Sequence, residues 1–338
     1  MRSGSIVVAA ALLAAGVPAA AQGQETVVKM ATLAPDGSRW HLILKETAEK
    51  WRALSGGRVA VRLYPGGVAG DDADMVRKMR LGTLSAAVLT AAGLAEIEPS
   101  VSALDLPLAY DSYDEVYWVL DRMRPRLEAG LEKNGFVVLN WADGGWTRFF
   151  TQKPVVVPDD LRALKLFTWA GDAKALAVWK AVGFEAVALP GAELGTALQS
   201  GQVSAVAVSP QIAVISQCYT SARNMTEMPW QLLLGATLIT KAAWDKVPAE
   251  TRPALLAAAQ DAGKRLRDEM RASGEKDVLE MKKRGLNVVP VNAKAREAWK
   301  KTAEGAWPRL RGEVVPAVAF DEALRLRDEY RKLPASSR

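Results

Sequence analysis

Few residues in this chain could carry out nucleophilic or metal chemistry. The 338 residues include one cysteine, Cys218, and one histidine, His41. A thiol nucleophile needs a basic partner such as histidine, and one histidine with one cysteine is too few for a zinc site. The sequence contains neither a G-x-S-x-G nucleophile elbow nor a Walker phosphate loop. We therefore expect a protein that is not an enzyme and needs no cofactor, with Cys218 as a small buried side chain.

Three neighbouring aspartates, Asp71, Asp72 and Asp74, resemble the start of a calcium-binding loop. The remaining ligands of an EF-hand are missing from the residues that follow. Aspartate is also favoured at the beginning of a helix, where its negative charge interacts well with the helix dipole. We interpret Asp71 or Asp72 as a helix cap and predict no metal site.

Composition indicates a soluble protein with a large core. About 49% of the residues are hydrophobic and 24% are charged, and the net charge is +6. Basic residues are scattered along the predicted helices and form no patch interleaved with aromatic residues, so a nucleic-acid partner is not expected. The length allows two domains.

The segment from Pro154 to Pro210 shows the pattern of an α/β fold. Strand-like runs at Leu164–Trp169, Glu185–Leu189 and Val203–Val208 alternate with helical segments at Ala173–Val182 and Glu193–Ser200. The last run is almost wholly apolar, which is typical of a parallel strand covered on both faces. Such an alternation predicts a mainly parallel sheet with helices on both sides.

The same segment resembles the solute receptors of TRAP (tripartite ATP-independent periplasmic) transporters, the DctP-type family. Pro158–Phe167 matches the family pattern P-x-D-L-K-G-L-K-I-R, and Glu193 with Ala197–Gly201 and Val203 matches E-x-x-x-A-L-Q-x-G-x-V. The resemblance extends over most of the chain through Gly56–Gly70, Arg80–Val88 and the motif Asp105–Tyr110. It implies a receptor that closes two lobes around a small organic solute.

Two positions depart from the family pattern. The arginine that clamps the ligand carboxylate in the family corresponds to Phe167, and the family Asp-Gly pair corresponds to Ser204-Ala205. A buried carboxylate without a cation is costly by several kcal/mol, and a phenyl ring cannot offset that cost. Either Arg148 supplies the cation through a bidentate contact, or the solute is apolar or aromatic. Alternatively, Phe167 packs in the domain core and Arg148 is a surface residue on a strand.

The N-terminus has the features of a secretory signal. Arg2 precedes the apolar run Ile6–Val17, and Ala19–Ala21 forms a cleavage site. The run is too short to span a bilayer comfortably. We predict export to a bacterial periplasm after removal of residues 1–21, without stable insertion into the membrane.

Candidate ligand contacts follow from the strand ends, because open parallel sheets bind ligands beyond the carboxyl ends of their strands. Tryptophans among these candidates are equally compatible with core packing. The predicted ligand-binding residues are Ser38, Trp40, Thr90, Tyr110, Trp146, Arg148, Phe167, Trp169, Ser209, Gln211 and Trp230.

The predicted fold is a two-lobed α/β periplasmic-binding-protein fold with mixed, mainly parallel sheets. The first lobe takes in residues 25–147 and about 234–260, and the second takes in 148–233 and about 285–293. Residues 248–338 provide a long helix spanning both lobes and the C-terminal helices Lys294–Trp307 and Phe320–Lys332, with Pro308 between these two. A polar turn is expected at Thr220–Glu227.

The predicted function is capture of a small organic solute and its delivery to the small and large membrane subunits of a TRAP-type transporter. Hinge closure would present a new surface to these subunits. Two alternatives stay open. One is a periplasmic carrier or sensor of an apolar ligand without a TRAP permease, and the other is a periplasmic enzyme that uses His41.

Overall fold

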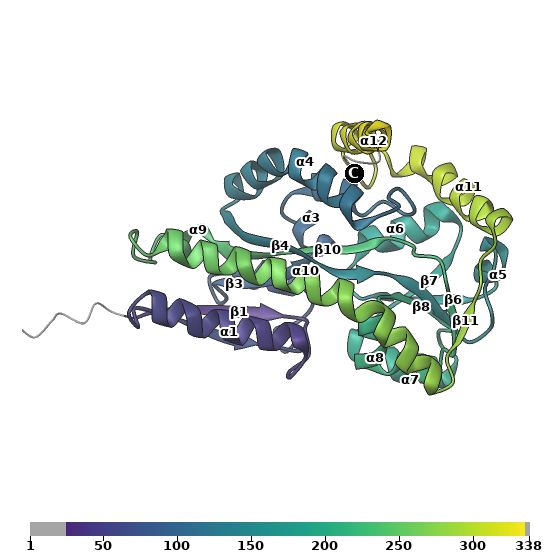
Figure 1. Ribbon diagram of the computed structural model, residues 1–338, viewed down its shortest axis with the longest axis horizontal. Coiled ribbons are helices and arrows are strands. Elements are labelled where there is room, and N and C mark those ends of the chain that lie inside the picture. Colours follow the sequence, from purple (N-terminus) through teal and green to yellow (C-terminus); the bar gives the residue numbers. More distant parts are fainter. Residues whose placement is uncertain (1–24, 335–338) are drawn as a thin grey trace, which may run out of the picture.

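The computed structural model describes residues 25–334, so the predicted signal sequence lies outside the described part of the chain. The chain forms two lobes, each built on one open β-sheet covered by helices (Figure 1). This arrangement confirms the predicted two-lobed α/β fold.

The sheet of the first lobe has five strands in the order β2-β1-β3-β10-β4. Strand β1 pairs in parallel with β2 and β3, and β10 runs antiparallel between β3 and β4. The strands are β1 (Thr26–Thr32), β2 (Val59–Tyr64), β3 (Ala86–Thr90), β4 (Phe136–Trp146) and β10 (Leu232–Thr240).

Alternation along β3 distributes its side chains to two cores. Ala87 and Leu89 pack into one cluster, while Ala86 and Val88 pack into another on the opposite face, as the period of two in a strand requires. Helices therefore cover both faces. They are α1 (Arg39–Leu54), α2 (Asp72–Arg80), α3 (Ala91–Ala95), the 3-10 helix η1 (Pro99–Leu104), α4 (Tyr113–Lys133), α9 (Lys241–Trp244) and α12 (Ala317–Lys332).

The sheet of the second lobe has six strands in the order β11-β9-β5-β8-β6-β7. Strand β6 pairs in parallel with β7 and β8, and β5 runs antiparallel to β8 and β9. The strands are β5 (Arg148–Thr151), β6 (Lys165–Trp169), β7 (Glu185–Leu189), β8 (Ala205–Val208), β9 (Asn224–Thr226) and β11 (Asn287–Val289).

Helices also cover both faces of this second sheet. Side chains of α5, α6 and α11 pack against one face, and side chains of α7, α8 and the end of α10 pack against the other. The helices are α5 (Pro158–Arg162), α6 (Ala173–Val182), η2 (Gly191–Glu193), α7 (Leu194–Ser200), α8 (Pro210–Ser216), η3 (Cys218–Thr220) and α11 (Ala293–Leu310).

Four segments connect the lobes, and one of them is the stretch of residues 311–316 between α11 of the second lobe and α12 of the first. Strand β4 of the first sheet continues into β5 of the second at Thr147, and the chain returns to β10 through Gln231. Helix α10 (Arg252–Lys283) runs along both lobes (Figure 1). Its Leu255 is buried in the core of the first lobe and its Met281 in the core of the second. Among the described residues, no helix is long and apolar enough to cross a membrane.

Two expectations about local structure are wrong. Residues 224–226 form strand β9 within the expected polar turn, because the Asn224 amide donates to the carbonyl oxygens of Thr151 and Gln152 and stays buried. Pro308 lies inside α11 instead of ending it. A proline costs one backbone hydrogen bond of the helix, but Ala306 and Leu310 on either side of it are buried and hold the last turn in place.

Candidate ligand cleft between the lobes

The two lobes touch at the first turn of α6. The Nζ of Lys174 in the second lobe donates to the carbonyl oxygen of Ala95 in the first, at 2.6 Å. A Cβ atom added to Gly171 would lie 2.8 Å from Oδ2 of Asp71. These contacts join α6 and the loop before it in the second lobe to α3 and the loop before α2 in the first lobe.

A glycine turn and a helix cap position this part of α6. Strand β6 ends at Trp169, and Gly171 has φ +87, a left-handed conformation that favours glycine. Asp172 then caps α6, because its Oδ1 accepts a hydrogen bond of 2.8 Å from the backbone N–H of Ala175. The turn thus directs Asp172 and Lys174 toward the first lobe.

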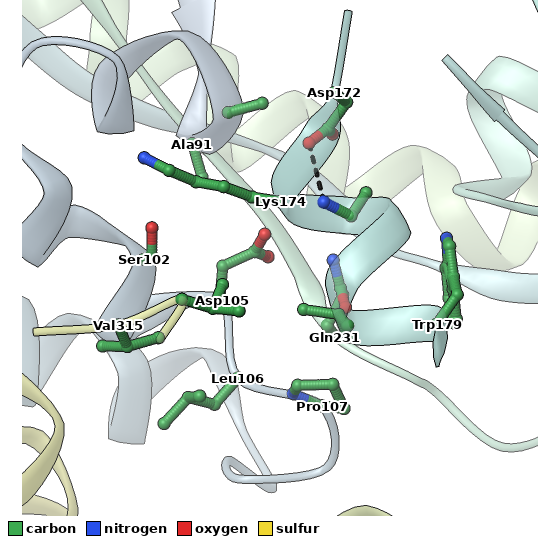
Figure 2. A pocket seen from close by; sticks show the side chains of 14 residues that line it. Ala91, Ser102, Asp105, Leu106, Pro107, Asp172, Lys174, Trp179, Gln231 and Val315 are labelled. Carbon is green, nitrogen blue, oxygen red and sulfur yellow. Dashed lines mark hydrogen bonds between the residues drawn. The ribbon is translucent and has the colours of Figure 1, made fainter. Parts of the chain in front are cut away.

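A cavity of about 70 Å³ lies between the lobes beside this turn (Figure 2). Such a volume holds several water molecules or a small organic group. Its walls come from α3, η1 and the following loop in the first lobe, from α6 in the second, and from the connecting segments. The lining residues are Ala91, Ala92, Ser102, Asp105, Leu106, Pro107, Asp172, Lys174, Ala175, Val178, Trp179, Gln231, Val314 and Val315.

Carboxyl groups dominate the charge around the cavity. Burial, followed by repulsion from Asp172, raises the pKa of Asp105 well above its ordinary value. Burial also raises the pKa of Asp172 and lowers that of Lys174. Each shift reflects the cost of keeping a charge away from water.

A further buried carboxyl group near the interface, that of Asp72, belongs to the first lobe, like Asp105. Burial raises its pKa to about 6, although two hydrogen bonds from Thr90 act in the opposite direction. The Thr90 hydroxyl donates to Oδ2 of Asp72 at 2.6 Å, and the Thr90 N–H donates to Oδ1 at 3.1 Å. The predicted cap at Asp71 is confirmed, since its Oδ1 accepts from the N–H of Asp74 at 2.9 Å.

Three of the predicted ligand residues lie at the junction of the two lobes. Trp146 contacts the Tyr113 ring with centroids 5.6 Å apart. Ser209 caps α8, and a Cβ on Gly145 would lie 3.8 Å from both the Ser209 Cβ and the Tyr113 hydroxyl. Arg148 pairs with Val208 at the end of β8 and donates to the carbonyl oxygen of Glu227. Burial lowers the Arg148 pKa.

Three other predicted residues lie in hydrophobic cores. Phe167 is 1% exposed, packs with the side chains of α7 and β8, and meets the Trp169 ring edge-on at 5.1 Å. Tyr110 donates its hydroxyl to the Ala103 carbonyl oxygen at 2.8 Å within the first core. Trp230 is 1% exposed in the second core, stacked on Trp179 at 5.6 Å. For Phe167 and Trp230 this burial agrees with the core-packing alternative, whereas Tyr110 was expected only as a ligand contact.

The remaining predictions are partly exposed residues at element ends. Ser38 caps α1 by accepting from the N–H of His41, and Trp40 in the first turn of α1 packs against clusters that include side chains of α10. Gln211 lies in the first turn of α8. Trp169 is the last residue of β6, and Thr90 is the last residue of β3. Thr90 donates to the Asp72 carboxyl group, and the Trp169 ring contacts Phe167.

The residues with the strongest polar character at the interface were not among the predicted contacts. Asp105, Asp172, Lys174 and Gln231 line the cavity. Asp172 lies three positions after β6, so extending the strand-end rule into the next helix turn would have found it. Asp105 stood in a recognised motif but follows no strand, and only the packing of η1 brings it to the cleft.

The cysteine and the histidine offer no reactive pair. Cys218 is 1% exposed, and burial raises its pKa to about 11, so the thiolate is disfavoured at neutral pH. His41 accepts a hydrogen bond from the N–H of Gly37 through Nδ1, at 3.0 Å. Among residues 25–334, no group of three or more histidine, cysteine, aspartate or glutamate side chains is arranged to hold a metal ion.

A family model described as DctP, bacterial extracellular solute-binding protein, family 7, matches residues 30–312. The chain belongs to this family. Family 7 proteins are periplasmic solute receptors of TRAP transporters rather than enzymes, and they work with TRAP membrane subunits. The resemblance inferred from the sequence motifs is therefore confirmed.

Relatives of this chain are also named as solute-binding proteins. A solute-binding protein from Chromohalobacter salexigens is 28% identical over 256 residues, covering 75% of this chain and 73% of that protein. The C4-dicarboxylate-binding periplasmic protein DctP of Rhodobacter capsulatus is 27% identical over 309 residues, covering 88% and 90%. The structure of the sugar acid binding protein DctPAm from Advenella mimigardefordensis with galactonate shares the fold, with a TM-score of 0.84, 20% identity and coverage of 90% and 99%.

Proposed function

We propose that this family 7 protein captures a small organic solute between its two lobes and delivers it to TRAP-type membrane subunits. The observation that carries the proposal is the contact of Lys174 and Gly171 with the opposite lobe, beside a cavity lined by both lobes. Closure around a solute gives a membrane partner a way to distinguish loaded from empty receptor.

We further propose that the solute is not a carboxylate clamped at the usual family position. The relatives named for C4-dicarboxylates and for galactonate bind acids, whereas the motif comparison assigns Phe167, a buried residue of this chain, to the position of the clamping arginine. Arg148, near the junction of the lobes, is the alternative cation for any anionic part of the solute. Its guanidinium forms a hydrogen bond to the Glu227 carbonyl oxygen and no salt bridge with a carboxylate of residues 25–334.

Native mass spectrometry of protein purified from its own periplasm tests the receptor function directly. The expected result is one co-purified organic molecule, with small-angle scattering showing an open form after its removal and a compact form after its return. If the protein has the same dimensions in scattering with and without the co-purified molecule, the receptor proposal is contradicted. Co-purification of TRAP membrane subunits with the loaded form only would support delivery, and their absence would favour the carrier or sensor.

Replacing Phe167 by arginine tests the unusual ligand class. Wild-type protein is expected to show no saturable binding of succinate or galactonate below millimolar concentration, and Phe167→Arg is expected to gain affinity for at least one of them. Calorimetric titration measures both. The matched control is Phe150→Arg, which places an equally buried charge in the same core without occupying the clamping position. Tight binding of either acid by wild-type protein would overturn the proposal.

A further inference from the structure

The carboxyl group of Asp105, a residue that lines the inter-lobe cavity, has one oxygen without a hydrogen-bond partner among residues 25–334. Its Oδ1 atom is buried, and no hydrogen-bond donor of residues 25–334 reaches it. Asp105 ends η1 and lines the cavity, and Figure 2 shows its carboxyl directed into the space between η1 and α6. A buried polar atom without a partner is rare in folded proteins and requires an explanation such as an absent ligand.

The acidic groups around Asp105 favour binding of a cation beside its carboxyl group. Asp172 faces Asp105 from the other lobe and acts on it by repulsion. Lys174 is the basic residue among those that line the cavity, and its amino group already donates to the carbonyl oxygen of Ala95 at 2.6 Å. Glu96, Asp71 and Asp72 add further negative charge around α6 and α2. An anionic ligand would be repelled from this cavity by the same groups.

The remaining walls fit a carbon chain. Leu106, Pro107, Val178 and Val315 are apolar and meet the Trp179 ring around the cavity. The volume of about 70 Å³ suits a short alkyl group together with one charged nitrogen. A metal ion fits poorly, because the acidic groups of the described residues do not converge as a ligand set.

We propose that this cavity binds the protonated primary amino group of the solute, with Asp105 as its principal partner and Asp172 as a second negative charge. Trp179 and the aliphatic residues cover the adjoining carbon atoms. This inference rests on the proposed receptor function and narrows the solute to a cationic amine.

Binding of a cation also has a consequence for protons. Burial favours the neutral form of Asp105 in the empty cavity, whereas an ammonium group favours the carboxylate. Ammonium binding therefore releases a proton, and affinity rises with pH until Asp105 is ionised in the empty protein. Among the facing groups, burial raises the pKa of Asp172 and lowers that of Lys174, so burial favours the neutral form of both.

Titration with n-propylammonium chloride tests the proposal, with 1-propanol and sodium propionate as neutral and anionic probes of similar size. We expect propylammonium to bind at least tenfold more tightly than 1-propanol and propionate not to bind, as measured by calorimetry and by the change in total tryptophan fluorescence. Calorimetry in buffers of different ionisation enthalpy should show proton release. Asp105→Asn should reduce propylammonium affinity at least tenfold, and Asp268→Asn, an exposed acid on α10, should not change it.

Equal binding of propylammonium and 1-propanol to wild-type protein would overturn the inference, as would unchanged affinity in Asp105→Asn. The comparison of three probes uses only wild-type protein, so it remains decisive if the variant folds poorly. A co-purified solute without a basic nitrogen, in a protein that still closes around it, would refute the amine site but leave the receptor function intact. Absence of any solute-dependent closure would instead refute the receptor function.

Discussion

Replacing Gly171 by alanine is expected to weaken solute binding by at least tenfold and to leave the loaded protein in an open form. The new Cβ would lie 2.8 Å from Oδ2 of Asp71 across the lobe interface, so the Asp71 side chain, whose Oδ1 caps α2, would have to shift for the lobes to meet. The clash exists only when the lobes meet, so it raises the free energy of the closed state relative to the open state. A loss of about 1.4 kcal/mol in closure corresponds to the tenfold loss of affinity.

Gly201→Ala provides the matched control. Gly201 has φ +75, similar to Gly171, but a Cβ added there meets no atom within 4 Å. Both variants therefore carry the cost of an alanine in the left-handed region, about 1–2 kcal/mol, and only Gly171→Ala opposes closure. Calorimetry with the co-purified solute and small-angle scattering measure the two effects. If both variants bind and close alike, the inter-lobe contact has no role in closure.

Truncation of Trp230 is expected to cause a large loss of stability in the second lobe. The Trp230 ring contacts Phe149, Trp179, Phe184 and Trp299 at centroid distances between 5.2 and 6.2 Å. Replacing a buried tryptophan by alanine removes that area and leaves a cavity, at a cost of about 3–5 kcal/mol. Urea denaturation followed by circular dichroism should therefore show a clear decrease in the midpoint for Trp230→Ala.

Trp230→Phe separates ring packing from the indole nitrogen. The Nε1 atom of Trp230 is buried without a hydrogen-bond partner in the described part of the chain, so removing it eliminates an unsatisfied donor. We expect the phenylalanine variant to retain most of the stability that alanine loses. A phenylalanine variant as unstable as the alanine variant would show that the indole nitrogen has a stabilising partner.

Local patterns in the sequence were sufficient to predict the helices and strands around the cleft. The alternation of apolar strands and helices from Leu164 to Val208 matches β6, α6, β7, α7 and β8. Asp71 caps a helix as expected, and the long apolar seam through Leu255 belongs to a helix that spans both lobes. These features depend on residues close in sequence, so periodicity and capping residues predict them.

The same reasoning could not assign side chains to the cleft. A position at a strand end does not decide which way its side chain points, and successive residues face opposite sides of the sheet. Phe167 and Trp230 consequently pack into cores. The β9 strand was missed because its hydrogen bonds go to β5 and β11, which are distant in sequence.

The sequence by itself determined the family and the two-lobed α/β fold, and its motif pattern predicts Phe167 at the position of the family arginine. Only the tertiary structure decided that Asp105 and Asp172 face one cavity, since these residues belong to different lobes. The physical reason is that strand and helix patterns are set by neighbouring residues, whereas charge and solvation at the cleft depend on how two separately folded sheets meet.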